Sequence, residues 1–164
     1  MYDISIPVII NNLTIMSKFL KKAESQIEAK KFDKAVVLGL RIYPDMLNLT
    51  KQIQIATDQA KGCGARLSGT AIPSFPDEEK TFDELQARLA KTIDYLKGLD
   101  QKLFEGADTR EVTLKVGGKD VAMSGQKYFT GAFLPNFFFH MTTTYNILRG
   151  IGVEIGKGDF LGRT

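Results

Sequence analysis

The first thirty residues carry a regular spacing of apolar side chains, and this spacing constrains the fold more than any other feature of the chain. Between about Ile4 and Lys30, apolar residues recur at steps of three and four, and lysines and glutamates occupy the positions between them. Such a pattern is typical of an amphipathic α-helix with one buried face. The apolar face consists of Ile6, Ile9, Leu13, Met16, Leu20, Ala23 and Ile27. A helix of this length must pack that face against other elements, so a helical bundle is expected.

Two further long helices are expected in the middle of the chain. Pro44 suits the first turn of a helix that ends at Gly69, because proline lacks only an N–H that has no partner there. Thr81, followed three residues later by Glu84, has the spacing of a capping box and predicts a helix that runs to about Leu103. A linker over residues 69–80 connects the two, and a short helix over residues 33–40 precedes them.

The hydrophobic period changes near residue 111. Apolar and polar residues alternate on both sides of Gly117-Gly118, which predicts a β-hairpin with a two-residue turn. A fourth helix is then expected over residues 126–149. The predicted fold class is all-α: a four-helix bundle with a β-hairpin inserted between helices 3 and 4, in which residues 1–164 form one domain.

Composition and charge argue against several classes of protein. The net charge of +3 is small and the basic residues are spread along the chain, so no nucleic-acid partner is expected. The single cysteine, Cys63, excludes an internal disulfide, and a reducing cytoplasm is the simplest location. The amino terminus lacks the pattern of a signal peptide. The most apolar stretch, residues 129–141, is too short to cross a bilayer, so no membrane partner is expected.

The fourth helix has an unusual composition. Pro135 lies well inside it and removes one backbone donor, so a bend is expected, which Gly131 would ease. The consecutive residues Phe137, Phe138 and Phe139 point around more than half of the helix circumference. This indicates a helix that is buried on nearly every side, both inside the bundle and at a homodimer interface.

The only histidine of the chain, His140, follows these phenylalanines. Asn136, His140 and Thr144 lie four residues apart, which is the spacing of paired metal-binding histidines on a helix, although only one of the three is histidine. Three interpretations are open. His140 is a buried histidine bonded to a backbone carbonyl or to a side chain of the second long helix, or it is a metal ligand or catalytic base, or it has another specific binding role.

Polar partners for His140 are available elsewhere in the sequence. Asp45 and Gln52 belong to a polar row on the second long helix, and either could meet His140 if that row faces inward rather than to solvent. Tyr145 is either a pocket hydroxyl or a core aromatic residue. The acidic run Asp77 to Glu79 lies in the linker, where exposure to solvent is expected.

Four segments give the chain a resemblance to a known family. They are "RIYPDMLNLTKQIQIATDQAKGCGARLSG", "TFDELQARLAKT", "FEGADTREVTL" and "LPNFFFHMTTTYNILRGIGVEIGKGDFLG". With them the chain resembles an uncharacterised family, a domain of unknown function found chiefly in bacteria, which is similar to the DinB/YfiT-like superfamily of metal-dependent helical bundles. The resemblance implies a DinB-like four-helix bundle that is often paired as a homodimer.

The superfamily's characterised members include thiol-dependent transferases and isomerases that bind a divalent metal with three histidines. By resemblance, "NILRGIG" places His140 at the second histidine of the last helix, Asn136 at the first, and Gln52 or a neighbour at the ligand of the second helix. Because two of the three histidines are absent, no cofactor is expected. The resulting hypothesis is a homodimer with a small-molecule pocket near His140 and no classical metal site. The alternative is a metal- or thiol-dependent transferase or hydrolase. In that enzyme, His140 would either bind a divalent metal or act as the general base.

Overall fold

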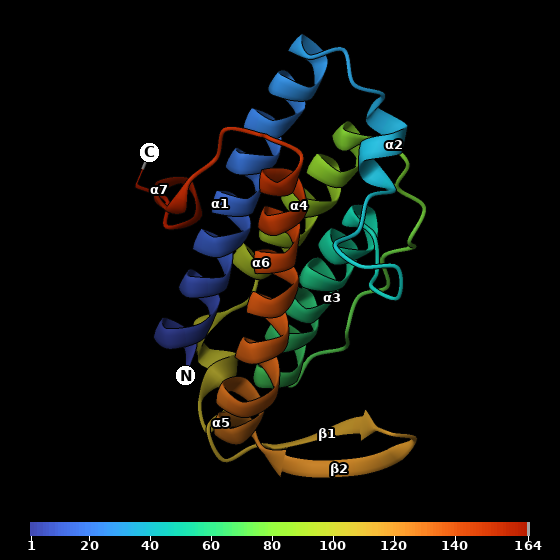
Figure 1. Cartoon of the computed structure of the whole chain (residues 1–164). Helices are drawn as coiled ribbons and strands as arrows, with labels where there is room; N and C mark the ends of the chain where they lie inside the picture. Colours follow the sequence, from blue (N-terminus) through green and yellow to red (C-terminus); the bar gives the residue numbers. More distant parts are fainter. Residues whose placement is uncertain (164) are drawn as a thin grey trace.

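A computed structural model describes residues 1–163 of the chain, and four long helices lying side by side form its body (Figure 1). They are α1 (Tyr2–Ala29), α3 (Leu49–Ser68), α4 (Phe82–Lys97) and α6 (Leu134–Gly150). The shorter helices are α2 (Lys34–Leu38), α5 (Gly125–Lys127) and α7 (Lys157–Phe160), and the strands are β1 (Glu111–Val116) and β2 (Lys119–Ser124). The prediction of a helical bundle with an inserted hairpin is confirmed.

Helix α1 has the buried face that its sequence predicts. All seven residues of the apolar face are buried, together with Ile15 and Phe19. Pro7 lies inside the first turns, as expected. The face packs mainly against α4 and contributes to one continuous hydrophobic core with α3 and α6.

The prediction that a helix begins at Pro44 is wrong. Helix α3 begins five residues later, at Leu49, because the side chain of Asn48 accepts a hydrogen bond from the backbone N–H of Lys51 and so caps the helix there. Pro44 lies instead in the loop between α2 and α3, which is held by a turn from Met46 N–H to Tyr43 O. This displacement leaves an irregular loop over residues 39–48, directly beside α6. The other end of α3 agrees with the sequence, since Gly69 has the left-handed conformation (φ 73°) that ends the helix.

Helix α4 begins as predicted and ends earlier. Thr81 and Glu84 form the expected capping box. The helix stops at Lys97 rather than near Leu103, because Gly98 follows and Asp100 caps a separate 3₁₀ turn over Gln101–Phe104.

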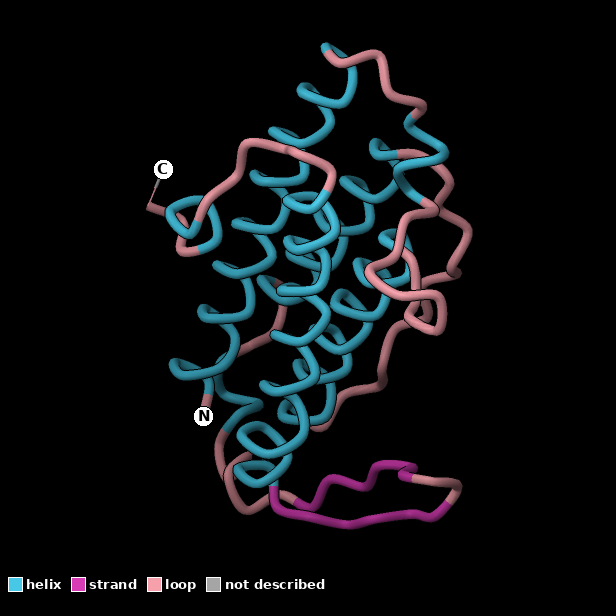
Figure 2. Tube along the Cα trace, viewed as in Figure 1, coloured by secondary structure: helices cyan, strands magenta, loops and turns pink. Residues whose placement is uncertain are grey.

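The hairpin has the predicted turn, and its register brings the apolar residues of the two strands together. Val112 pairs with Met123 and Leu114 with Val121, so the apolar residues share one face. Gly117 and Gly118 both have positive φ (57° and 80°), as the two-residue hairpin turn requires. The hairpin extends away from one end of the bundle (Figure 2). Only its base packs on the core, since Val112 is buried and Val116 is 57% exposed.

The last helix contains a wider turn than expected. Residues Tyr128–Phe133 form a π-helix, and α6 follows directly with Pro135 in its first turn. A proline at position 135 cannot donate to the carbonyl of residue 131 and would clash with it in an α-helix. The π-helix widens the backbone at that place, so the missing bond and the ring are accommodated without an end to the helix.

The three phenylalanines of α6 do not share one environment. Phe137 is buried and Phe138 is half-buried, whereas Phe139 is 54% exposed. The prediction that the helix is buried on nearly every side is therefore wrong for the single chain, because the irregular loop over residues 39–48 covers this side only in part. Within residues 1–163, no helix combines the length and the apolar character needed to cross a bilayer.

Candidate functional site

His140 lies on the face of α6 that packs against α3. His140 is only 7% exposed, and its imidazole Nδ1 lies 2.6 Å from Oε1 of Gln52 on α3. Gln52, at the position where the resemblance places the metal ligand of the second long helix, is thus in direct contact with His140. The hydroxyl of Thr144, one turn further along, donates to the backbone carbonyl of His140 and does not reach the ring.

The orientation of Gln52 is fixed by the loop that precedes α3. Its Nε2 donates a hydrogen bond of 2.9 Å to the carbonyl oxygen of Leu47. Because a carbonyl can only accept, the NH₂ group must face Leu47 and Oε1 must face His140. Oε1 is also only an acceptor, so the proton of the neutral imidazole lies on Nδ1. The chain from Leu47 through Gln52 to His140 therefore fixes both the position and the tautomer of the ring.

The second ring nitrogen of His140 is left with a free lone pair. Within the described part of the chain, Nε2 has no hydrogen-bond partner, and the one fully buried side-chain atom without a partner there is Oε1 of Gln54. Nε2 therefore keeps some access to solvent. Burial lowers the pKa of His140 below its usual 6.5, so the ring is neutral at pH 7 and Nε2 can accept a proton or a hydrogen bond.

A shallow groove of about 540 Å³ runs beside this histidine. It lies between the loop over residues 39–48 and the outer side of α6, and the ring of Phe139 meets the imidazole edge to face at 5.2 Å. None of the described residues that line the groove is charged. They are Ile42, Met46, Phe138, Phe139, Thr142, Thr143 and Asn146.

The remaining residues predicted for the site lie apart from the histidine. Asp45 is exposed in the loop before α3, and Asn136 is exposed on α6. Tyr145 lies on a different side of α6, where its hydroxyl donates to the carbonyl of Ile155 and its ring contacts Phe19 and Phe160. Of the five predicted pocket residues, the structure brings together Gln52 and His140.

The residues around His140 do not fit the three-histidine metal site of the superfamily. Among the residues that the structure describes, no group of three or more histidines, cysteines, aspartates or glutamates is close enough together to hold a metal ion. The neighbour of His140 at the corresponding position is an amide, which presents a weak neutral oxygen, and that oxygen is already used by the Nδ1 proton. Cys63 offers no thiolate, since burial raises the pKa of its thiol far above the usual range.

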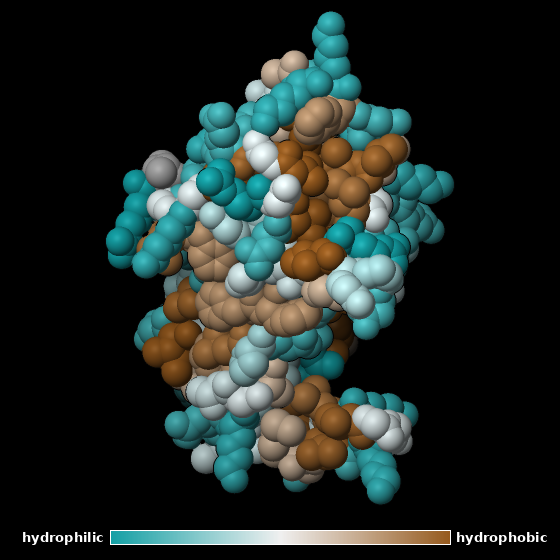
Figure 3. Space-filling model, in the orientation of Figure 1, coloured by the Kyte–Doolittle hydropathy of each residue, from teal (hydrophilic) through white to brown (hydrophobic). Residues whose placement is uncertain are grey.

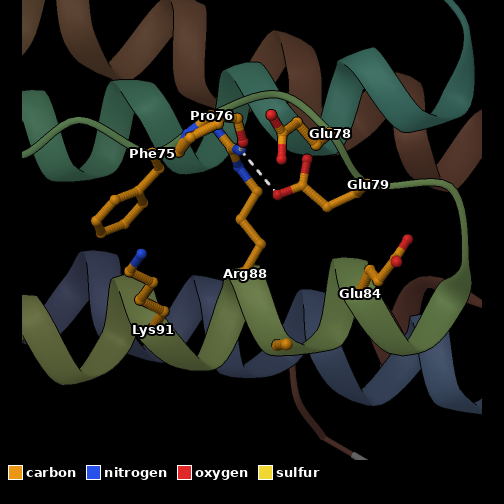
Figure 4. Close-up of a pocket in the computed structure, with 8 residues that line it drawn as sticks. Phe75, Pro76, Glu78, Glu79, Glu84, Arg88 and Lys91 are labelled. Carbon is orange, nitrogen blue, oxygen red and sulfur yellow. Dashed lines mark hydrogen bonds and ion pairs between the residues drawn. The ribbon is translucent and has the colours of Figure 1, made fainter.

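A second polar cluster is centred on Arg88 of α4, and it was not predicted from the sequence. Its guanidinium is 2% exposed and binds the linker over residues 69–80 (Figure 4). Nη1 donates to the carbonyl of Pro76 (2.9 Å) and to Glu79 (3.0 Å), and Nη2 lies 2.9 Å from Asp77. The expectation that the acidic run Asp77 to Glu79 is exposed is therefore wrong for Glu79, whose side chain is 13% exposed.

Arg88 also binds α3, because Nε donates to Thr57 (2.7 Å) and Nη2 to Asp58 (2.7 Å). Burial would lower the pKa of Arg88, but Glu79, Asp58 and Asp77 raise it, so the charge is retained. The adjoining pocket of about 290 Å³ includes Phe75 and Lys91 (Figure 4). Since every N–H of the guanidinium has a protein acceptor, Arg88 has no donor left for a ligand, and the cluster holds the linker in place. An arginine on the same side of its helix as Leu85 was the signal in the sequence.

Comparison with solved structures defines the class of protein. A crystal structure of a "dinb family member protein" from Shewanella denitrificans is 37% identical to this chain, with a TM-score of 0.89. The match covers 98% of this chain and 91% of that one, so the fold is DinB-like. The chain belongs to the family described as "Domain of unknown function (DUF1993)", which matches residues 1–161. No curated protein matches it.

Proposed function

We propose that this protein is a homodimeric, cytoplasmic binding protein that holds a small, uncharged molecule in the groove beside His140. The observation that supports it is the hydrogen-bonded chain from Leu47 through Gln52 to His140, which leaves Nε2 as a neutral acceptor on a buried residue in contact with Phe139 of the groove. An apolar lining with a few placed polar groups is typical of small-molecule sites. A fitting ligand has an aromatic or aliphatic body for Phe138 and Phe139 and one hydrogen-bond donor for Nε2.

The departure from the three-histidine pattern supports binding without a metal. Zinc sites in proteins use three or four nitrogen, sulfur or oxygen ligands. Within residues 1–163, His140 is the one strong metal ligand at this place, and the side-chain oxygen of Gln52 is turned toward its imidazole. Protein purified without a histidine tag should contain far less than one equivalent of zinc, nickel or iron by mass spectrometry. A stoichiometric metal that is lost in His140→Ala would contradict the proposal.

Binding can be tested with phenol and toluene, which have similar shapes but differ in a hydroxyl donor. Phenol should shift the Nε2 resonance of His140 and the amide resonances of Phe138 and Phe139 in a concentration-dependent manner. Toluene should shift the amide resonances alone. If neither probe shifts resonances along the groove, the proposed binding site is wrong.

A second function is favoured by one specific observation. A neutral histidine with a fixed Nδ1 proton and a free Nε2 lone pair has the form of a general base. In this alternative, the protein is a transferase or hydrolase in which Nε2 removes a proton from a substrate hydroxyl or thiol in the groove. Hydrolysis of nitrophenyl esters that depends on His140, with a rate that falls as the histidine is protonated, would favour the enzyme over the binding protein.

A further inference from the structure

The groove beside His140 is too open in the single chain to enclose a ligand. Small-molecule sites bury most of the surface of their ligand. Here one wall is α6 and the other is the loop over residues 39–48, and the outer side faces solvent. The side chain of Phe139 is 54% exposed at the rim. A further surface is needed to complete the site.

The groove continues into a larger exposed apolar surface. We name it the loop–α6 face and define it by Ile42, Tyr43, Met46, Leu47, Phe138 and Phe139. Tyr43 is 66% exposed and Ile42 51%, and Leu47 and Phe139 are exposed to a similar extent. Residues of high hydropathy gather over α2 and the adjoining part of α6, and the loop that follows α2 shows both apolar and polar residues (Figure 3). Aromatic residues and methionine without charge are the composition of a protein–protein interface core.

The exposed area of this face matches what a modest dimer needs. Tyr43 and Phe139 at these exposed fractions present on the order of 250 Å² together. Ile42 and Leu47 add roughly 100 Å². Because about 60% of a dimer interface is apolar, a core of about 350 Å² corresponds to about 600 Å² per partner, which is the lower end of the range for stable complexes.

Charges at the edge of the face favour a second copy as the occupant. The loop carries one cation and one anion, Arg41 and Asp45, and both are exposed, with Nη1 of Arg41 donating to the carbonyl of Pro44 (3.4 Å). In a two-fold symmetric interface, residue i of one copy meets residue j of the other and the reverse. Arg41 can then face Asp45 twice, and the uncharged centre brings no like charges together.

We propose that the loop–α6 face is the homodimer interface and that the second copy closes the groove beside His140. This rests on the homodimer and binding site proposed above, and it adds which surface pairs. Phe139, next to the histidine, then lies at the centre of the interface. The partner supplies the outer wall that the single chain lacks, so that the binding site is complete only in the dimer.

Sedimentation velocity of the full chain tests the inference, over a range from about 1 to 100 µM that brackets a micromolar dissociation constant. The variants are Phe139→Asp on α6 and Tyr43→Asp in the loop, and circular dichroism confirms that both fold. The control is Ile4→Asp, which places the same charge on a residue of α1 that is 57% exposed. Replacing an aromatic residue at the centre of an interface weakens binding about 30-fold. Each substitution occurs twice in a symmetric dimer, so the dimer dissociation constant should rise about 1,000-fold.

The expected result is a wild-type dimer, a dimer in Ile4→Asp and monomers in the other two variants. Because Tyr43 does not line the groove, phenol should also lose its effect on Nε2 of His140 in Tyr43→Asp. Dimers that persist in Phe139→Asp and Tyr43→Asp would overturn the inference but leave a homodimer with another interface. A wild-type monomer throughout the range would overturn both the homodimer and this interface. Undiminished phenol binding in a monomeric Tyr43→Asp would overturn closure of the groove by the partner.

Discussion

Replacement of Arg88 by methionine should destabilise the fold more than replacement of any polar residue in the linker that Arg88 binds. Methionine fills a similar volume without charge, so the packing of α4 is kept. The change removes a guanidinium that is 2% exposed and leaves three carboxylates, Asp58, Asp77 and Glu79, without their shared cation. It also removes the donor for the carbonyl of Pro76, which ties the linker to the bundle.

The magnitude follows from the exposure of the groups left behind. Loss of one partner of a buried ion pair costs about 3–5 kcal/mol. Asp58 and Asp77 are 38% and 37% exposed, so solvent relieves part of the repulsion and the lower value, about 3 kcal/mol, applies. For a chain of this length, that corresponds to a melting temperature lower by roughly 6–12 °C at pH 7.

The loss should depend on pH with a definite sign. Burial alone would raise the pKa of Glu79, but hydrogen bonds from Gln54 and Arg88 lower it below 4.5 in the folded protein. Its stabilising effect is therefore present above the unfolded pKa and is lost as the pH falls through the folded pKa. In Arg88→Met, Asp58 and Asp77 keep their lysine partners, Lys61 and Lys51, whereas Glu79 has lost its cation. These carboxylates become neutral in acid, so the difference in melting temperature between wild type and variant should shrink from about pH 5 to pH 3.

Thermal melts followed by circular dichroism at several pH values provide the assay. Lys91→Met is the matched control, since it removes a cation from the same helix. Within residues 1–163, the ammonium group of Lys91 forms no ion pair and lies 4.2 Å from the ring centroid of Phe75. That change should cost no more than about 1 kcal/mol. A variant Arg88→Met that melts within a degree or two of Lys91→Met, or that has the same deficit at acidic and neutral pH, would show that the charge of Arg88 does not hold the linker on the bundle.

Three other predictions concern the bundle and the histidine. Gly125→Ala should cost about 3 kcal/mol, because the added Cβ would overlap the carbonyl oxygen of Ala107. Gly131→Ala should be neutral or stabilising by up to about 1 kcal/mol in denaturant titrations, because beyond the helix's own backbone nothing lies within 4 Å of the added Cβ. Thr81→Ala should lose about 1 kcal/mol by the same measurement, since it removes the capping box of α4; a change below a few tenths would contradict this. In the unfolded chain, His140 takes up a proton near pH 6.5, whereas in the folded protein it does so only at lower pH. The free energy of unfolding should therefore fall as the pH drops from about 7 to about 5.5. His140→Gln should remove that part of the dependence of stability on pH.

The helical part of the fold could be predicted because its signals are local. The apolar face of α1, the capping box at Thr81 and the Gly117-Gly118 turn are each set by residues within a few positions of one another. The start of α3 could not be placed, because Pro44 and Asn48 are both acceptable first residues. In the structure, the Asn48 side chain caps α3, and a hydrogen bond from Leu49 N–H to the carbonyl of Leu40 holds that start.

The candidate site depends on contacts between distant residues. Gln52 and His140 are 88 positions apart, and only the packing of α3 on α6 shows that they meet. The backbone carbonyl of Leu47 carries no signal in the sequence, yet it determines the tautomer of the ring. Phe139 is as apolar as Phe137, and its exposure follows from how far the irregular loop extends over α6.

Gln52 holds His140 as a neutral ring with its proton on Nδ1 and a free Nε2. Because the chain contains one histidine, long-range proton–nitrogen NMR of the imidazole reports on this residue alone. At pH 7.5 the spectrum should show a protonated Nδ1 and an unprotonated Nε2, and Gln52→Leu should abolish this preference. A ring protonated on Nε2, or one whose tautomer is unchanged in Gln52→Leu, would contradict the account.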